Sequence, residues 1–157
     1  MKIETIIFDL GGVLIDWNPR HLYRKVFSKQ EEMDYFLENV CTGIWNAQQD
    51  AGRSFEEAVK LKQAEFPKYK HEIAFYFSRW TEMLNGGIQG TVEILEQLYF
   101  KRNVRLYALT NWSAETFPYA LDRFHFLRFF EGIVVSGKEK MKKPDPSIYQ
   151  IILQRYD

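Results

Sequence analysis

A single aspartate near the start of the chain stands where a reactive carboxylate could be placed. Asp9 follows the apolar run Ile6-Ile7-Phe8 and precedes the pair Gly11-Gly12. A short apolar run with β-branched and aromatic residues is typical of a buried strand of a parallel sheet, and ligands of open α/β sheets bind at the carboxyl ends of the strands. Asp9 is therefore a candidate nucleophile or metal ligand, although an aspartate at this position can also cap a turn.

Two further polar segments follow apolar runs later in the chain. Thr110-Asn111 comes directly after residues 104–109, and Lys143 lies in a lysine-rich segment after residues 132–135. A carboxylate, a hydroxyl, an amide and a lysine together suit a phosphoryl group, because the carboxylate can attack phosphorus to form an acyl phosphate while the other groups donate hydrogen bonds and neutralise charge. Taken singly, Thr110-Asn111 also fits an ordinary turn, and the lysines fit a solvated loop.

The negative charges of such a site need more than one cation. A carboxylate charge and a phosphate charge about 4 Å apart repel by roughly 4 kcal/mol at an effective dielectric constant of 20. A second phosphate charge increases this repulsion, so beside Lys143 we expect a bound Mg²⁺.

Helical patterns dominate the segment between residues 17 and 87. Apolar residues recur at helical spacing, and the pairs Ser28/Glu31 and Ser54/Glu57 predict capping boxes. Residues 16–19 predict a turn, and Asn85-Gly86-Gly87 predicts the end of the last helix. The aromatic residues of this segment are more often core than ligand contacts, but four of them could stack on a sugar: Trp45, Phe55, Phe75 and Trp80.

After Gly90 the pattern alternates between helices and strands. We expect helices over 91–101 and 113–126, strands over 104–109 and 132–135, a polar loop, and a last helix that begins at Asp145-Pro146. This alternation predicts an α/β fold, a Rossmann-like doubly wound parallel sheet. The core would comprise residues 1–16 and 88–157, and residues 17–87 would be an inserted helical cap that folds over the strand ends.

Composition excludes several classes of function. Lys plus Arg equals Asp plus Glu, 21 each in 157 residues, so no basic excess indicates a nucleic-acid partner. No apolar stretch approaches about 20 residues, so we expect no membrane span. The single cysteine, Cys41, cannot form an internal disulfide, and this favours a cytoplasmic location. The remaining partner class is a small phosphorylated metabolite, and the oligomeric state is not indicated.

Three segments in order resemble the first three motifs of the haloacid-dehalogenase-like hydrolase superfamily. They are residues 8–14, Leu109-Thr110-Asn111, and residues 143–146 with Tyr149. The Asp-Leu-Gly start of the first motif is similar to a capped branch of bacterial sugar-phosphate phosphatases of the glucose-1-phosphate type, as are the cap segments 43–45, 50–52 and 54–55.

The resemblance implies a role for each matching residue. Asp9 would be the nucleophile and a Mg²⁺ ligand, and the backbone carbonyl of Gly11 would be a second ligand. Thr110 and Asn111 would bind phosphate, and Lys143 would be both catalytic and phosphate-binding. The implied function is Mg²⁺-dependent hydrolysis of a phosphomonoester, expected to be a sugar phosphate, through an aspartyl-phosphate intermediate. A non-catalytic domain that binds phosphorylated metabolites and a 2-haloacid dehalogenase remain as alternatives.

Two departures from the family pattern matter. Gly11 occupies the position of the family's general acid/base aspartate, and such a group is typically worth about 10²–10⁴-fold in rate. A sugar 1-phosphate, which has a comparatively good leaving group, is therefore the expected substrate. The family's acidic fourth motif would lie beyond Asp157. We accordingly expect a truncated form of a longer protein, with the first strand as an unpaired edge, weak Mg²⁺ binding and poor turnover.

Overall fold

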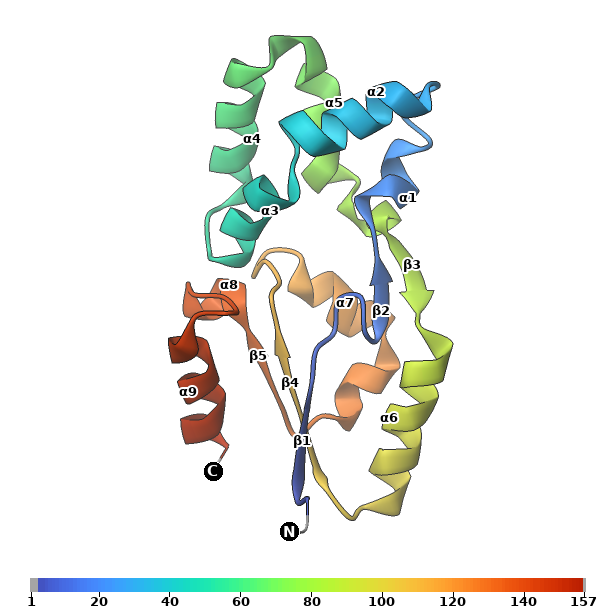
Figure 1. Ribbon diagram of the computed structural model, residues 1–157, viewed down its shortest axis with the longest axis vertical. Helices are drawn as coiled ribbons and strands as arrows, with labels where there is room; N and C mark the ends of the chain where they lie inside the picture. Colours follow the sequence, from blue (N-terminus) through green and yellow to red (C-terminus); the bar gives the residue numbers. More distant parts are fainter. Residues whose placement is uncertain (1–2, 157) are drawn as a thin grey trace.

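A computed structural model describes residues 3–156, which form two lobes joined by a short ribbon (Figure 1). The sheet lobe contains β1 (Thr5–Phe8), α6 (Gln89–Lys101), β4 (Arg105–Thr110), α7 (Phe117–Arg123), η4 (His125–Phe129), β5 (Gly132–Val135), α8 (Ser136–Glu139) and α9 (Pro146–Arg155). The helical lobe contains α1 (Pro19–Tyr23), α2 (Gln30–Tyr35), η1 (Phe36–Val40), α3 (Gly43–Asp50), α4 (Phe55–Glu65), η2 (Pro67–Tyr69), α5 (Lys70–Ser78) and η3 (Trp80–Met83). The ribbon pairs β2 (Ile15–Trp17) with β3 (Leu84–Gly87).

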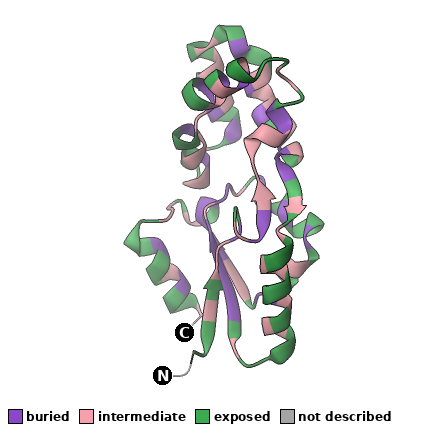
Figure 2. Cartoon of the chain, turned by 45° about the vertical axis from the view of Figure 1, so that its right-hand side comes forward, coloured by how far each residue is buried: buried purple, intermediate pink, exposed green. Residues whose placement is uncertain are grey.

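The sheet of the sheet lobe is parallel, with the strand order β1-β4-β5. Alternate residues of β4 enter different cores: Leu106 and Ala108 join the cluster that contains Leu95 of α6, whereas Tyr107 and Leu109 pack with α9. Helices lie on both faces of the sheet, and the central strand β4 is mostly buried between them (Figure 2). The expectation of a buried strand before Asp9 is wrong, because β1 forms the edge of the sheet and Ile7 is 43% exposed. The predicted α/β fold with a doubly wound parallel sheet is confirmed.

Aromatic side chains form much of the core of the helical lobe. Tyr23 packs on Phe36 with ring centroids 4.8 Å apart, and Trp45 packs edge-on against Tyr76 at 4.9 Å. Cys41 is buried in the same cluster, and burial raises the pKa of its thiol well above the usual range, as suits a packing residue. None of the described helices is long and apolar enough to cross a membrane.

The prediction of an entirely helical segment over residues 17–87 is wrong at both ends. Instead of a turn and a helix end, β2 and β3 pair antiparallel, with Trp17 opposite Leu84. Gly86 adopts a φ of +124°, which glycine accommodates without strain. Strands of three and four residues are too short to show a period, and their pairing bridges almost seventy residues of sequence, so tertiary contact decided this element.

Several local predictions can also be compared with the structure. Ser54 caps α4, because its hydroxyl accepts a hydrogen bond from the Glu57 N–H at 3.2 Å, and Asp145 caps α9 in the same manner. The predicted capping box at Ser28 is wrong, since Lys29 occupies the N-cap position of α2 and its side chain makes no capping hydrogen bond. The predicted helix over 113–126 begins only at Phe117, and the start of the predicted polar loop is the short helix α8.

Candidate active site

The carboxyl ends of β1 and β4 bring three of the predicted residues to one edge of the sheet. Asp9 directly follows β1, and Thr110 is the last residue of β4, the strand that pairs with β1. The segment after α8 returns to this edge and places Lys143 against Asp9. Parallel pairing makes adjacent strands end on the same side, so two distant sequence segments meet here.

Asp9 and Lys143 form a partly solvent-accessible ion pair. Lys143 Nζ lies 2.8 Å from Asp9 Oδ2 and also donates to the Leu109 carbonyl at 2.9 Å. Asp9 Oδ1 accepts from the Leu10 N–H at 2.8 Å. The Asp9 side chain is 41% exposed and that of Lys143 is 19% exposed. An ammonium group has three N–H donors, so Lys143 retains one for a further anion while it holds Asp9 in place.

The Asn111 side chain binds the backbone of Lys143. Its Nδ2 donates to the Lys143 carbonyl at 3.0 Å, and its Oδ1 accepts from the Lys143 N–H at 2.8 Å. This two-point contact fixes the segment that carries the lysine. The amide predicted to bind phosphate is therefore engaged in positioning Lys143, although Nδ2 retains one N–H.

Thr110 carries a buried hydroxyl without a partner. The residue is fully buried, and Thr110 Oγ1 makes no hydrogen bond within residues 3–156. A buried polar atom left unpaired costs about 1–3 kcal/mol, and such atoms in native proteins call for an explanation such as a ligand, an ion or water. The predicted phosphate donor thus has a free hydroxyl at the end of β4, beside the residues that hold Lys143.

Gly11 leaves open space beside Asp9. A Cβ atom built on Gly11 would have nothing within 4 Å. Within residues 3–156 the Gly11 carbonyl accepts no hydrogen bond, so it remains available as a ligand. One carboxylate and one carbonyl oxygen suit Mg²⁺, which keeps several waters and binds substrate phosphates besides one or two carboxylates. Over the described part of the chain no group of three or more His, Cys, Asp or Glu side chains could hold a metal by itself.

A cavity of about 60 Å³ lies between the lobes next to these residues. Phe55 and Trp80, two of the four aromatic residues predicted as sugar contacts, line it. Trp45 and Phe75 do not, since Trp45 packs on Tyr76 and Phe75 packs under the Arg79 guanidinium. The complete lining is Gly11, Trp17, Asn46, Asp50, Phe55, Trp80, Asn111, Trp112, Ser113 and Thr116.

Sequence reasoning missed three residues of this cavity that matter for its chemistry. Trp112 directly follows Thr110-Asn111, so its position was a usable signal. Trp17 was assigned to a turn, whereas it belongs to the ribbon. Asp50 ends α3, and burial raises the pKa of its carboxyl to about 6, although the Lys142 charge and the Ser113 backbone N–H act in the opposite direction. The resemblance of segment 50–52 to the phosphatase branch was a signal for this part of the cap, but no spacing in the sequence marks Asp50 as a neighbour of Gly11.

Comparisons with known proteins point to one family. The family model described as haloacid dehalogenase-like hydrolase matches residues 6–157. A sesquiterpene phosphatase of Aspergillus oryzae is 26% identical over 154 residues, which cover 98% of this chain and 74% of the relative. A phosphorylated carbohydrates phosphatase of Thermotoga maritima is 26% identical over 160 residues, which cover 98% of this chain and 70% of the relative.

A solved structure has a similar fold. It is a variant of a HAD family enzyme from Bacteroides thetaiotaomicron, in complex with magnesium and inorganic phosphate. The TM-score is 0.68 at 20% sequence identity, and the alignment covers 98% of this chain and 78% of that one.

Proposed function

The chain belongs to the haloacid dehalogenase-like hydrolase family, and from this premise we propose that it hydrolyses phosphomonoesters through a phosphorylated Asp9. The observation that carries the proposal is the Asp9–Lys143 pair at 2.8 Å beside the unpartnered hydroxyl of Thr110. Together they offer a nucleophile, a positive charge and a donor without a partner. The two curated relatives are phosphatases by name, which supports the same chemistry.

Each residue of the candidate site has its own role in the proposed reaction. The Asp9 carboxylate attacks phosphorus, the bond from phosphorus to the leaving oxygen breaks, and water later hydrolyses the acyl phosphate. Lys143 offsets the repulsion between Asp9 and the phosphoryl oxygens with its remaining N–H, and Thr110 donates from its hydroxyl. Asn111 holds the Lys143 backbone and contributes its spare Nδ2 hydrogen.

We propose Mg²⁺ as the cofactor, held by the Asp9 carboxylate and the Gly11 carbonyl. When bound, it would supply charge neutralisation at the phosphoryl oxygens. The magnesium and phosphate in the related Bacteroides enzyme support this assignment.

We propose a sugar phosphate as substrate, with the 1-phosphate preferred. Aromatic walls with amide and hydroxyl groups between them, as in the cavity, suit contacts with a sugar ring. The cavity of about 60 Å³ is smaller than a hexose, so the lobes would have to open to admit one. The helical lobe would then act as a cap over the site, with the predicted bounds 17–87 for the cap and 1–16 and 88–157 for the core. A cytoplasmic location also remains a prediction.

Trapping of the intermediate tests the proposal. We expect hydrolysis of phosphomonoesters that stops when EDTA removes divalent metal, a phosphorylated peptide containing Asp9 after acid quench, and faster turnover of hexose 1-phosphates than of hexose 6-phosphates. Phosphate transfer to another side chain would overturn the assignment of Asp9. Binding of beryllium fluoride without turnover would favour the non-catalytic alternative, and halide release from a 2-haloacid would favour a dehalogenase.

A further inference from the structure

None of the sheet-lobe residues assigned to the proposed reaction supplies a general acid. An alkoxide leaving from phosphorus needs a proton in the transition state, and water that attacks the acyl phosphate needs a base. Asp9 is the nucleophile, Lys143 is paired with it, and Gly11 has no side chain. Of the ten residues that line the cavity, Asp50 is the one that carries a carboxyl group.

We propose that Asp50 of the helical lobe supplies the general acid and base across the open space above Gly11. The inference rests on the proposed phosphatase function and extends it to a second catalytic carboxyl. Asp50 and Gly11 line the same cavity, and a Cβ on Gly11 would meet no atom within 4 Å, so no side chain of Gly11 stands between the cap carboxyl and the leaving oxygen.

The structure fixes Asp50 to the sheet lobe, although Asp50 belongs to the helical lobe. Its backbone carbonyl accepts from Ser136 Oγ at 2.5 Å, and the same hydroxyl oxygen accepts from the Trp112 N–H at 2.9 Å. Gly52, two residues later, approaches the α8 segment so closely that a Cβ would lie 3.3 Å from the Gly137 carbonyl. Asp50 is thus held by the segments that follow β4 and β5, the strands that carry the candidate site.

The surroundings of Asp50 suit a group that exchanges a proton near neutral pH. Burial raises the pKa of its carboxyl to about 6, while Lys142 and the Ser113 N–H limit the rise. The Asn46 amide lies 3.4 Å from Asp50 Oδ2. The other titratable neighbour is Tyr76, which is uncharged because burial raises the pKa of its phenol well above the usual range. A carboxyl poised near the working pH is able both to give and to take a proton.

Asp50 gives one proton in the first step of the reaction and takes one back in the second. As Asp9 bonds to phosphorus, protonated Asp50 gives its proton to the leaving oxygen, the alcohol departs, and Asp50 becomes a carboxylate. As water attacks the phosphorus of the acyl phosphate, Asp50 takes the water proton, inorganic phosphate leaves, and the Asp9 carboxylate and the Asp50 acid are restored.

The decisive experiment measures how kcat/KM depends on the leaving group in the wild type and in the Asp50→Asn variant of the full chain. The asparagine keeps an acceptor for the Ser113 N–H but cannot give up a proton as an acid. We expect kcat/KM for an alkyl phosphate to fall by about 10²–10⁴-fold and kcat/KM for p-nitrophenyl phosphate to change less than about threefold, because nitrophenolate leaves without a proton and kcat/KM ends with its departure. The decline of alkyl phosphate hydrolysis above about pH 6 in the wild type should be absent from the variant.

Two controls separate the possible failures. Glu115→Gln changes another carboxyl that joins the lobes, since Glu115 Oε1 accepts from the Phe55 N–H at 2.8 Å, but Glu115 does not line the cavity. It should leave the ratio of alkyl to aryl hydrolysis unchanged. Equal losses on both substrates in Asp50→Asn, or no loss on either, would overturn the role of Asp50 while hydrolysis that depends on Asp9 upholds the phosphatase. Absence of any hydrolysis that depends on Asp9 would overturn both proposals.

Discussion

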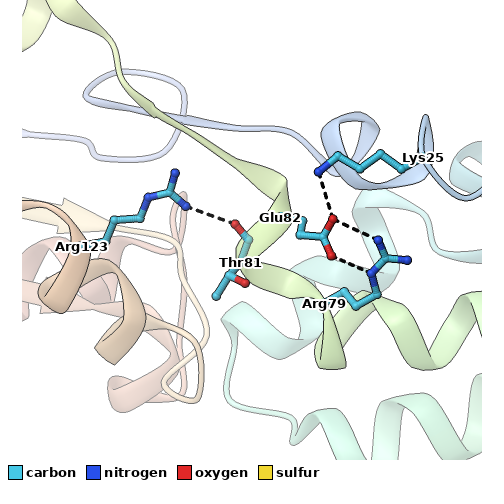
Figure 3. Close-up of polar contacts among 5 residues, drawn as sticks. All are labelled: Lys25, Arg79, Thr81, Glu82 and Arg123. Atoms are coloured by element: carbon cyan, nitrogen blue, oxygen red, sulfur yellow. Dashed lines mark hydrogen bonds and ion pairs between the residues drawn. The ribbon is translucent and has the colours of Figure 1, made fainter.

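Two carboxylates in this molecule are held by cations at similar distances, yet only one has groups left for chemistry. Glu82 lies beside the ribbon, where Arg79 donates to its two oxygens at 2.6 and 3.0 Å and Lys25 donates to Oε2 at 3.0 Å (Figure 3). Nearby, Arg123 of α7 donates to the Thr81 carbonyl at 3.3 Å and so links the lobes. Asp9 has a single cation, Lys143, at 2.8 Å.

The difference lies in what remains uncommitted. Both Glu82 oxygens accept hydrogen bonds from cations, and the cluster joins Lys25, just after α1, and Arg79, just after α5, to η3. Around Asp9, one N–H of Lys143, the Thr110 hydroxyl and the Gly11 carbonyl have no partner in the described chain, and a cavity adjoins them. Hydrogen-bond donors and acceptors without a partner, rather than the presence of an ion pair, distinguish a reactive site from a structural contact.

The strongest test of this comparison changes each carboxylate to its amide. Asp9→Asn should lower phosphatase kcat/KM by at least about 10⁴-fold, because an amide cannot form the acyl phosphate. Glu82→Gln, the same chemical change in the saturated cluster, should stay within about twofold of wild type. Steady-state kinetics on one aryl phosphate measures both. Comparable losses in the two variants would remove the distinction between the clusters.

Loss of the lysine charge at the candidate site should have the second-largest effect on activity. Lys143→Met removes the charge that holds Asp9 and faces phosphate, and we expect a fall in kcat/KM of about 10²–10³-fold, as for loss of one positioned donor. Lys138→Met, in the neighbouring helix α8, is the control, since Lys138 is exposed and only packs over the Phe117 ring at 5.7 Å. A Lys143 variant as active as the control would show that the pair at Asp9 is merely structural.

The unpartnered hydroxyl predicts opposite effects on stability and activity. Thr110→Val should raise the free energy of unfolding by about 1 kcal/mol, because it removes a buried polar atom without a partner, and should lower kcat/KM by about 10²-fold. Thr116→Val should instead destabilise the protein, since Thr116 Oγ1 accepts from Trp112 Nε1 at 3.1 Å. Urea midpoints for the two variants provide the comparison, and destabilisation by both would contradict an unpaired Thr110.

The smallest effect concerns the acid stability of the Glu82 cluster. The hydrogen bonds of Arg79 and Lys25 lower the pKa of Glu82 to about 2, from an ordinary value of 4.5. Because the folded-state pKa is depressed, the contribution of Glu82 is complete above about pH 4.5 and disappears as pH falls toward about 2. Glu82→Gln should cost less than about 1 kcal/mol at pH 7, since the cluster is open to solvent. The difference from wild type in urea unfolding should shrink over this pH interval; a constant difference would argue against the ion pairs.

The family resemblance selected Lys143 among the lysines of residues 138–143, but the sequence alone determined the parallel sheet and the convergence of Asp9, Thr110 and this lysine-rich segment on one edge. These follow from local signals, namely apolar runs that end in polar residues and alternate with helices, because parallel strands must end side by side. A pattern of this kind needs no knowledge of distant contacts. The caps at Ser54 and Asp145 were predictable for the same reason, since a cap involves residues two or three positions apart.

Only the tertiary structure decided which residue of the helical lobe faces the site. The placement of Asp50 and Trp17 depends on the β2–β3 ribbon, whose strands lie almost seventy residues apart, and on the contact of Asp50 with Ser136. The partner of the Asn111 amide and the isolation of the Thr110 hydroxyl likewise depend on how the loops close. Such contacts arise from long-range packing, which leaves no periodic trace in the sequence because the residues involved share no local spacing.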